Sequence, residues 1–451
     1  MANPPVYRGK EPCEMNKNDF APTPPMGWNS YDCYDTAVTE AEVRSNAAYM
    51  ARRLLPYGWE YVVVDIQWYA RRPNAQRETW QYLPFGELAM DEYSRLLPDP
   101  ERFPSSRDGA GFGPLADYVH SLGLKFGIHI MRGIPRLAAH QRRGIKGWSG
   151  TADQIAQPWP VCRWNPDMYG VRSGEGGQAY YNSLLELYAA WGVDFIKCDD
   201  ICNTDNASPF YEGKYGARHE VEMLANAIAA CGRPIVLSLS PGPALIGEAW
   251  HYARYANMWR ITDDLWDDWA LVKAMFPRCE LWEKHVSPGC WPDCDMLPLG
   301  RIGKGFGDER ETRLTAEEQK TMMTLWCIFG SPLMLGAELT ALDERTLPLL
   351  TNREVLSLLD PARKRRQAWR DEESAVWISE DPADGSVCAA LFNLSDRERE
   401  VSAGPEALRL PPRTLSAAEL WTGEQTVCEG GVLRAVLPAH GCRLFRATPD
   451  R

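Results

Sequence analysis

A short apolar run, 194–200, ends in a lysine and two carboxylates, and its sequence is DFIKCDD. Side chains two residues apart share one face of a strand, so Lys197 and Asp199 point the same way. The ammonium keeps a neighbouring carboxylate ionised, because the opposite charge favours its charged form. An ionised carboxylate fixed at the end of a buried strand suits a nucleophile that attacks the anomeric carbon of a sugar. For this run alone, a salt bridge at a strand end is the structural alternative.

Asp264 is the candidate partner of Asp199. By strand alternation Arg260 and Asp264 look inward, whereas Asp263 looks outward unless the strand has already ended. Two carboxylates flanking a glycosidic bond are the minimal equipment for glycoside hydrolysis. The proton donor of such a pair needs a raised pKa, which burial and repulsion from Asp199 would supply.

The segments that must position these residues alternate between strand-like and helix-like patterns. We expect strands at 24–30, 61–68, 125–131, 194–200, 234–240, 257–264, 292–297 and 332–339. We expect helices at 40–57, 114–122, 178–191, 218–230, 244–254, 266–275 and 316–329. This alternation predicts an α/β fold of the (β/α)8 TIM barrel type. A doubly wound sheet is the rival fold, but the chain lacks a Gly-rich first turn.

The pattern changes near Asp360. Short alternating runs at 375–379, 386–393, 431–437 and 442–445 are divided by Gly, Pro, Asp and Asn turns. They predict a C-terminal antiparallel β-domain, a sandwich. We therefore divide the chain into an N-terminal extension (1–23), a catalytic barrel (24–361) and a C-terminal β-sandwich (362–451).

Polar residues recur at the predicted C-terminal strand ends, where a barrel of this type carries its site. They are Asp65, His129, Lys197, Asp199, Asp200, Ser240, Arg260, Asp263, Asp264, Asp293 and Asp295. Carboxylates at the mouths of four strands exceed what a purely structural barrel needs, because buried charges are costly unless paired. Aromatic residues nearby offer apolar walls for a sugar ring, although core packing is the commoner role of any one tryptophan. These candidates are Trp28, Tyr31, Trp68, Trp164 and Trp259.

Composition excludes several other functions. The formal charge of −12 argues against nucleic acid and anionic membrane partners, since no basic run is present for phosphates. No run approaches the ~18 apolar residues of a membrane span, and residues 1–20 lack a signal-peptide core. Thirteen scattered cysteines favour a reducing cytoplasm over a disulfide framework. The oligomeric state stays open, a homo-oligomer included.

Two other chemistries fit the sequence less well. A metal-dependent barrel hydrolase needs several histidines at strand ends, and of seven histidines only His129 lies at one. Two cysteine pairs with four-residue spacing have no matching histidine pair, so we expect no metal site and no cofactor. A sugar-binding barrel without turnover would keep tryptophans and some acids. It has no evident need of both the Lys197–Asp199 pair and the Arg260–Asp264 pair.

Five motifs occur in order: PMGWNSY (25–31), GLKFGIH (123–129), GVDFIKCD (192–199), WRITDD (259–264) and DCDML (293–297). Together they resemble family-27 glycoside hydrolases, the α-galactosidase and α-N-acetylgalactosaminidase family. The resemblance runs from Pro24 to about Leu339 and is weaker in the C-terminal domain. It implies a (β/α)8 barrel followed by a β-sandwich, retention of configuration, and no metal for the chemistry.

Carried onto the matching positions, the resemblance implies that Asp199 is the nucleophile and Asp264 the acid/base. Tyr31 falls where the family usually has a tryptophan wall. The residues that the resemblance places around the sugar hydroxyls are Asp65, Lys197, Arg260 and Asp295.

Four positions depart from the family's α-galactosidases. Ile66 replaces the second of two adjacent acids, which normally grips the galactose 4- and 6-hydroxyls. His129 stands where a tyrosine is common, and Ser240 stands where a glutamate near the 2-hydroxyl is frequent. Ile201 occupies the position of a family disulfide cysteine, which agrees with a cytoplasmic enzyme.

We therefore predict a retaining exo-glycosidase that acts by double displacement on a terminal α-linked, galactose-like sugar, with carbohydrate as its partner. Ile66 would instead fit a pyranose lacking the 6-hydroxymethyl group, such as β-L-arabinopyranose. Ser240, as in α-N-acetylgalactosaminidases, would fit N-acetylgalactosamine. A non-catalytic carbohydrate-binding barrel is the alternative from another class.

Overall fold

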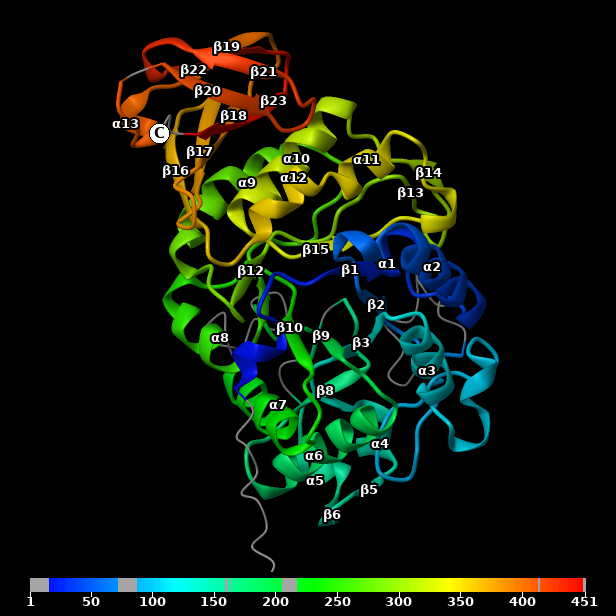
Figure 1. Cartoon of the computed structure of the whole chain (residues 1–451). Coiled ribbons are helices and arrows are strands. Elements are labelled where there is room, and N and C mark those ends of the chain that lie inside the picture. The colour runs from blue at the N-terminus through cyan, green and yellow to red at the C-terminus, as the bar shows by residue number, and fades with distance from the viewer. Residues whose placement is uncertain are drawn as a thin grey trace, which may run out of the picture.

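The computed structural model describes residues 16–71, 87–158, 161–162, 164–204, 217–412 and 414–448. Figure 1 shows a barrel ringed by helices, with a separate β-domain (orange and red) at one side of it. Residues 1–15 of the predicted N-terminal extension and the last residues of the predicted sandwich, 449–451, lie outside the described part.

Eight parallel strands build the barrel wall. They are β1 Met26–Asn29, β2 Tyr61–Val64, β3 Lys125–Met131, β9 Phe195–Asp199, β10 Val236–Leu239, β11 Met258–Arg260, β12 Trp291–Asp293 and β15 Leu333–Leu335. From β1 to β12 the neighbours follow chain order, and β15 pairs with β1 on its other side. The wall closes beyond β12, where Leu297 and Leu335 form a parallel bridge. The predicted (β/α)8 barrel is confirmed. No strand extends more than one residue beyond its predicted range, but β2, β11, β12 and β15 each end four residues earlier than predicted.

Helices follow most strands. The longer ones are α2 Glu40–Arg53, α3 Gly113–Ser121, α6 Glu175–Ala190, α7 Arg218–Ala230, α8 Ala249–Tyr255, α9 Trp269–Trp282 and α10 Ala316–Phe329. The helix α2 starts at a capping box between Thr39 and Glu42, in which each side chain binds the backbone N–H of the other. The helix α9 begins later than predicted, because the Asp268 side chain caps it by accepting from the Ala270 N–H.

Shorter elements occupy the connections. The short helices are α1 Tyr31–Tyr34, α4 Arg136–His140, α5 Ala152–Ile155, α11 Thr346–Thr351 and α12 Arg353–Leu356. The short strands are β4 Ile134–Pro135, β5 Gly144–Ile145, β6 Trp148–Thr151, β7 Ala156–Gln157, β8 Met168–Val171, β13 Arg301–Ile302 and β14 Arg310–Glu311. None of the described helices has both the length and the apolar character needed to cross a bilayer.

Strand alternation sorts the barrel side chains between two cores. Inward-facing residues fill the lumen in one buried cluster that includes Tyr61, Phe195, Val236, Met258 and Trp291. Their strand neighbours, such as Val62 and Ile196, belong to the larger cluster between strands and helices. By the same alternation Lys197 and Asp199 also face the lumen. Each lies two residues closer than the one before to the C-terminal end of the strand, where the barrel opens.

Two glycines make room for the aromatic rings of the lumen. A Cβ at Gly27 would lie 2.4 Å from the Tyr61 carbonyl oxygen, and one at Gly127 would lie 2.9 Å from the Phe195 Cβ. The Tyr61 and Phe195 rings then pack with centroids 5.3 Å apart. Packed side chains therefore fill the barrel beneath the polar residues, which are left at the mouth.

The described part of the N-terminal extension covers the opposite, N-terminal end of the barrel. The Ala21 carbonyl accepts hydrogen bonds from the Trp291 indole at 2.8 Å and from the Gly289 N–H at 3.0 Å. The Asn257 side chain donates to the Lys17 carbonyl at 2.9 Å. These contacts leave the C-terminal face as the open end of the lumen.

The C-terminal domain is an antiparallel β-sandwich, as predicted. One sheet has the order β16-β17-β18-β23-β20-β21, and β19 pairs with β22 in the other. Their bounds are β16 Lys364–Arg370, β17 Ser374–Glu380, β18 Val387–Asn393, β19 Arg399–Ala403, β20 Leu415–Glu419, β21 Gln425–Cys428, β22 Leu433–Leu437 and β23 Cys442–Thr448, with helix α13 Pro405–Leu408 between β19 and β20. The domain docks on the barrel through the aromatic pairs Phe276–Phe392 and Phe329–Trp377. The predicted boundary at 361/362 falls in the connection that leads into β16.

Candidate active site

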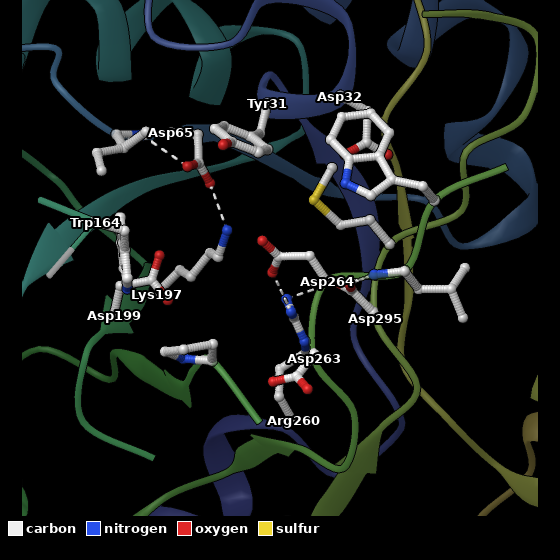
Figure 2. Close-up of a pocket in the computed structure, with 15 residues that line it drawn as sticks. Tyr31, Asp32, Asp65, Trp164, Lys197, Asp199, Arg260, Asp263, Asp264 and Asp295 are labelled. Atoms are coloured by element: carbon white, nitrogen blue, oxygen red, sulfur yellow. Dashed lines mark hydrogen bonds and ion pairs between the residues drawn. The ribbon is translucent and has the colours of Figure 1, made fainter. Parts of the chain in front are cut away.

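A cavity of about 340 Å³ opens at the C-terminal strand ends (Figure 2). Ten of the residues singled out in the sequence line it, including both carboxylates of the expected pair. They are Tyr31, Asp65, Ile66, Trp164, Lys197, Asp199, Arg260, Asp263, Asp264 and Asp295. Strands far apart in the sequence thus bring the expected site together.

Lys197 is the positive centre of one wall. Its ammonium lies 2.9 Å from Asp65 Oδ2 and 5.6 Å from the centroid of the Tyr31 ring. Burial opposes the charged form of Lys197, but Asp65 and Asp199 outweigh it and raise the lysine pKa above its ordinary range. The same ion pair lowers the pKa of the fully buried Asp65 despite the opposing effect of its burial. Both groups are therefore charged.

Asp199 is held as an ionised carboxylate. Its Oδ2 lies 2.8 Å from His129 Nε2, and its Oδ1 accepts a hydrogen bond from the Ser240 hydroxyl. The residue is only 8% exposed, and this burial works against the charge. The Lys197 charge and the bonds from His129 and Ser240 nevertheless hold the pKa of Asp199 well below its usual range.

Arg260 organises the facing wall. Its guanidinium nitrogens lie 2.5 Å from both Asp264 Oδ1 and Asp295 Oδ1. The second Asp295 oxygen accepts from the Leu265 N–H at 2.6 Å. Burial raises the pKa of Asp295, and the Arg260 charge opposes that rise. In Figure 2 this group lies across the cavity from Lys197 and Asp199.

The predicted burial of Asp264 is wrong, because its side chain is 62% exposed. The strand β11 ends at Arg260, and the chain bends through residues 261–263 before it reaches Asp264. Because the strand has ended, Asp263 no longer has to face outward. Asp263 and Asp264 both line the cavity at its solvent-exposed rim.

His129 and Ser240, expected among the sugar-contacting residues, lie behind Asp199 instead. Both are fully buried, and neither belongs to the described cavity lining. The side chain of each meets the Asp199 carboxylate. The structure thus assigns them to holding the carboxylate rather than to touching a ligand.

Trp28, Trp68 and Trp259 are corrected from cavity walls to core residues. Alternation explains two of them, since Gly27 and Asn29 on β1, and Met258 and Arg260 on β11, take the inward positions. Trp28 donates its indole N–H to the Ala337 carbonyl, and Trp68 donates to the His129 carbonyl, each at 2.7 Å. Trp259 packs on Tyr252 and Trp282. The aromatic lining comes instead from Tyr31, Trp164 and Trp266.

Several lining residues were not predicted. They are Asp32, Pro241, Leu265, Trp266 and Met296. Four of them directly follow a candidate residue, and Trp266 lies two residues after Asp264, so proximity to the motifs was the available signal. Trp266 also joins an aromatic group with Phe306, whose ring centroid lies 5.2 Å away.

A buried ion network supports the strand end that carries Asp199. The Arg132 backbone N–H donates to the Asp199 carbonyl at 2.9 Å, and its guanidinium binds the Asp200 and Glu220 carboxylates at 2.5 and 2.9 Å. Asp200 therefore turns away from the cavity, at a backbone φ of 57°. Within the described chain, no group of three or more His, Cys, Asp or Glu residues is arranged to hold a metal ion.

Family models and known relatives match both domains of the chain. The chain matches the family model for alpha galactosidase A over residues 167–360 and that for the alpha galactosidase C-terminal beta sandwich domain over 371–447. It is 26% identical to an α-galactosidase of Cyamopsis tetragonoloba over 441 residues, which cover 96% of this chain and 88% of the relative.

Two of the solved proteins are more similar in sequence. A β-L-arabinopyranosidase of glycoside hydrolase family 27 from Geobacillus stearothermophilus is 50% identical, with a TM-score of 0.90 and coverage of 97% of this chain and 99% of the other. A Bacillus halodurans protein described as a candidate α-N-acetylgalactosaminidase is 48% identical, with a TM-score of 0.82 and coverage of 95% and 97%. On this similarity the chain belongs to glycoside hydrolase family 27, and it is a glycosidase.

Proposed function

We propose that this glycosidase removes terminal β-L-arabinopyranosyl residues with retention of configuration, and that α-D-galactosides are its second substrates. The observation that carries the choice of sugar is the apolar Ile66 side chain in the cavity lining, next to Asp65. The two sugars share their ring configuration. They differ in that the arabinopyranose has no hydroxymethyl group on C5.

A hydrogen bond between the Ile66 backbone and the Asp65 carboxylate holds the two residues together. The Ile66 N–H donates to Asp65 Oδ1 at 2.8 Å, so the apolar side chain adjoins a carboxylate expected to bind sugar hydroxyls. A hydroxymethyl group placed against Ile66 would lose a hydrogen-bond partner for its hydroxyl, at a cost of about 1–3 kcal/mol. A pyranose with only CH₂ at that position would incur no such loss.

The relatives support the same order of preference. The Geobacillus relative is described as a β-L-arabinopyranosidase, and a single-site variant of it has been crystallised with arabinose. The α-galactosidases among the relatives support galactosides as the second candidate. N-acetylgalactosamine is less favoured, because Ser240 is occupied with Asp199 and does not open into the described cavity.

The proposed mechanism is a double displacement. Asp199, buried and ionised, attacks the anomeric carbon while Asp264 gives a proton to the leaving oxygen. Asp264 lies at the exposed rim, where water can enter. In the second step Asp264 takes a proton from that water, which attacks the glycosyl-enzyme and returns the original anomeric configuration.

Removing either carboxylate tests this mechanism. We expect Asp199→Ala and Asp264→Ala each to lower kcat by about 10³-fold or more, since each removes a group on which bond cleavage depends. Asp263→Ala is the matched control at the rim and is expected to keep most activity. Steady-state kinetics on 4-nitrophenyl β-L-arabinopyranoside and NMR of the first-formed anomer are the measurements. Near-normal turnover in either variant, or an inverted product, would rule the mechanism out.

The charge on Lys197 provides a pH test. It is the largest effect that lowers the Asp199 pKa against burial, so its loss leaves the buried carboxylate uncompensated. We expect Lys197→Met to raise the Asp199 pKa and to move the acid limb of kcat/KM to higher pH, because Asp199 reacts only when ionised. Ser240→Ala, which removes one hydrogen bond, should give a smaller shift in the same direction. Superimposable acid limbs for all three proteins would contradict this account.

The choice of sugar depends on Ile66. We expect Ile66→Asp to raise the ratio of kcat/KM for the α-D-galactoside to that for the β-L-arabinopyranoside by about 10-fold, because the new carboxylate can accept from the hydroxymethyl O–H. Ile66→Val keeps an apolar side chain and should leave the ratio near that of the unaltered enzyme. Parallel assays with the two 4-nitrophenyl glycosides measure it. The sugar assignment fails if the aspartate variant keeps the original ratio while remaining active.

A reducing cytoplasm stays our proposal for the compartment. All twelve cysteines of the described chain are free thiols, and all but Cys231 are buried. Even Cys279 and Cys294, with sulfurs 3.6 Å apart, are unbonded. We expect thiol titration of the denatured, unreduced protein to find all thirteen cysteines reactive. Substantially fewer would indicate disulfides and an oxidising compartment.

A further inference from the structure

Asp32 is a carboxyl group of the cavity to which the proposed mechanism gives no role. It is the second residue of α1, directly after Tyr31, and it lines the cavity although the residue is only 4% exposed. Its Oδ2 has no hydrogen-bond partner among the described residues. A buried polar atom without a partner is costly, so a carboxyl group that carries one and lines a cavity is a candidate for binding the occupant.

The backbone on both sides fixes the position of this carboxyl. The Asp32 carbonyl accepts from the Gly303 N–H at 2.8 Å. Gly336, just after β15, lies so close that a Cβ there would come 2.2 Å from Asp32 Oδ2. Any side chain at Gly336 would displace the carboxyl. Because Gly336 has no side chain, the Asp32 carboxyl keeps its position at the cavity.

The charges around Asp32 favour its neutral form. Burial is the largest effect, and together with Asp295, Asp264 and Asp65 it raises the pKa of Asp32 well above the ordinary value. Lys197 opposes this rise, but its ammonium is already bound to Asp65. A neutral carboxyl offers one O–H donor and an acceptor oxygen. A sugar hydroxyl, which both donates and accepts, is the matching partner.

We propose that Asp32 is a further binding residue of this site, with its carboxyl hydrogen-bonded to a hydroxyl group of the substrate. The inference rests on the proposed function, because it takes the cavity to hold a glycoside. Asp32 lines the same cavity as Asp65, expected beside the sugar, and Asp264, expected at the leaving oxygen. The hydroxyl belongs either to the terminal sugar or to the leaving group, and the substrates below separate the two.

Two substitutions separate a binding role from a structural one. Asp32→Asn keeps the size, a donor and an acceptor, and should stay within about 3-fold of the unaltered enzyme. Asp32→Ala removes the hydrogen bond and should raise KM by about 10-fold or more while kcat changes less than 3-fold. Asp117→Ala, at an exposed position on α3, is the control for unspecific effects. A structural role would instead lower kcat and the melting temperature, and asparagine would not restore KM.

The substrates identify which hydroxyl is bound. A rise in KM for both 4-nitrophenyl β-L-arabinopyranoside and a disaccharide with the same terminal sugar places the hydroxyl on that sugar. A rise for the disaccharide alone places it on the leaving group, because the nitrophenyl group carries no hydroxyl. An unchanged KM for both substrates in a folded Asp32→Ala variant overturns the inference. So does an asparagine variant as impaired as the alanine variant.

A structural measurement covers the case in which Asp32→Ala does not fold. In a crystal structure of the Asp199→Asn variant with the uncleaved disaccharide, we expect a substrate oxygen within about 3.2 Å of an Asp32 carboxyl oxygen. No substrate oxygen within that distance overturns the inference. The proposed function fails separately, through absent turnover by the unaltered enzyme or full turnover by Asp199→Ala.

Discussion

One ammonium group, Lys197 Nζ, sets the charge state of the site. It lies 2.9 Å from Asp65 and is the largest effect that keeps the pKa of the buried Asp199 low. Two buried carboxylates so close to each other would otherwise repel, and one of them would take up a proton. A nucleophile must be ionised before the substrate arrives, so the role proposed for Asp199 depends on a neighbour two residues away on the same strand.

That dependence made much of the site predictable from the sequence. The two-residue repeat of a strand is local geometry, so the inward direction of Lys197 and Asp199 follows once the strand is recognised. The same rule would also have placed Trp28 and Trp259 on the outward face, beside inward-facing neighbours. The rule stops where a strand stops, and β11 stops at Arg260. The predicted burial of Asp264 was wrong because it extended the repeat into a bend.

The rest depends on contacts between strands, about which a single sequence says little. His129 is paired in register with Lys197, and Ser240 follows the strand on the other side of β9. This register brings both side chains to Asp199 rather than to the cavity. This register cannot be deduced from the number of residues between the strands. The orphaned oxygen of Asp32 is likewise invisible without Gly303 and Gly336, which lie about 300 residues further along the chain.

The balance of charge in the cavity limits what it can bind. Six lining residues carry carboxyl groups and two carry fixed positive charges, so the carboxyl groups exceed the cations by four. Asp263 and Asp264 lie at the exposed rim, where water can solvate their charges, whereas Asp32 is buried and favours its neutral form. An anionic sugar would meet Asp65 and Asp199 with no unpaired cation in the described lining to receive it. Asp199 is thus a buried, ionised carboxylate, whereas Asp264 is exposed at the rim, so the proposed nucleophile and the proposed acid are chemically identical side chains in different surroundings.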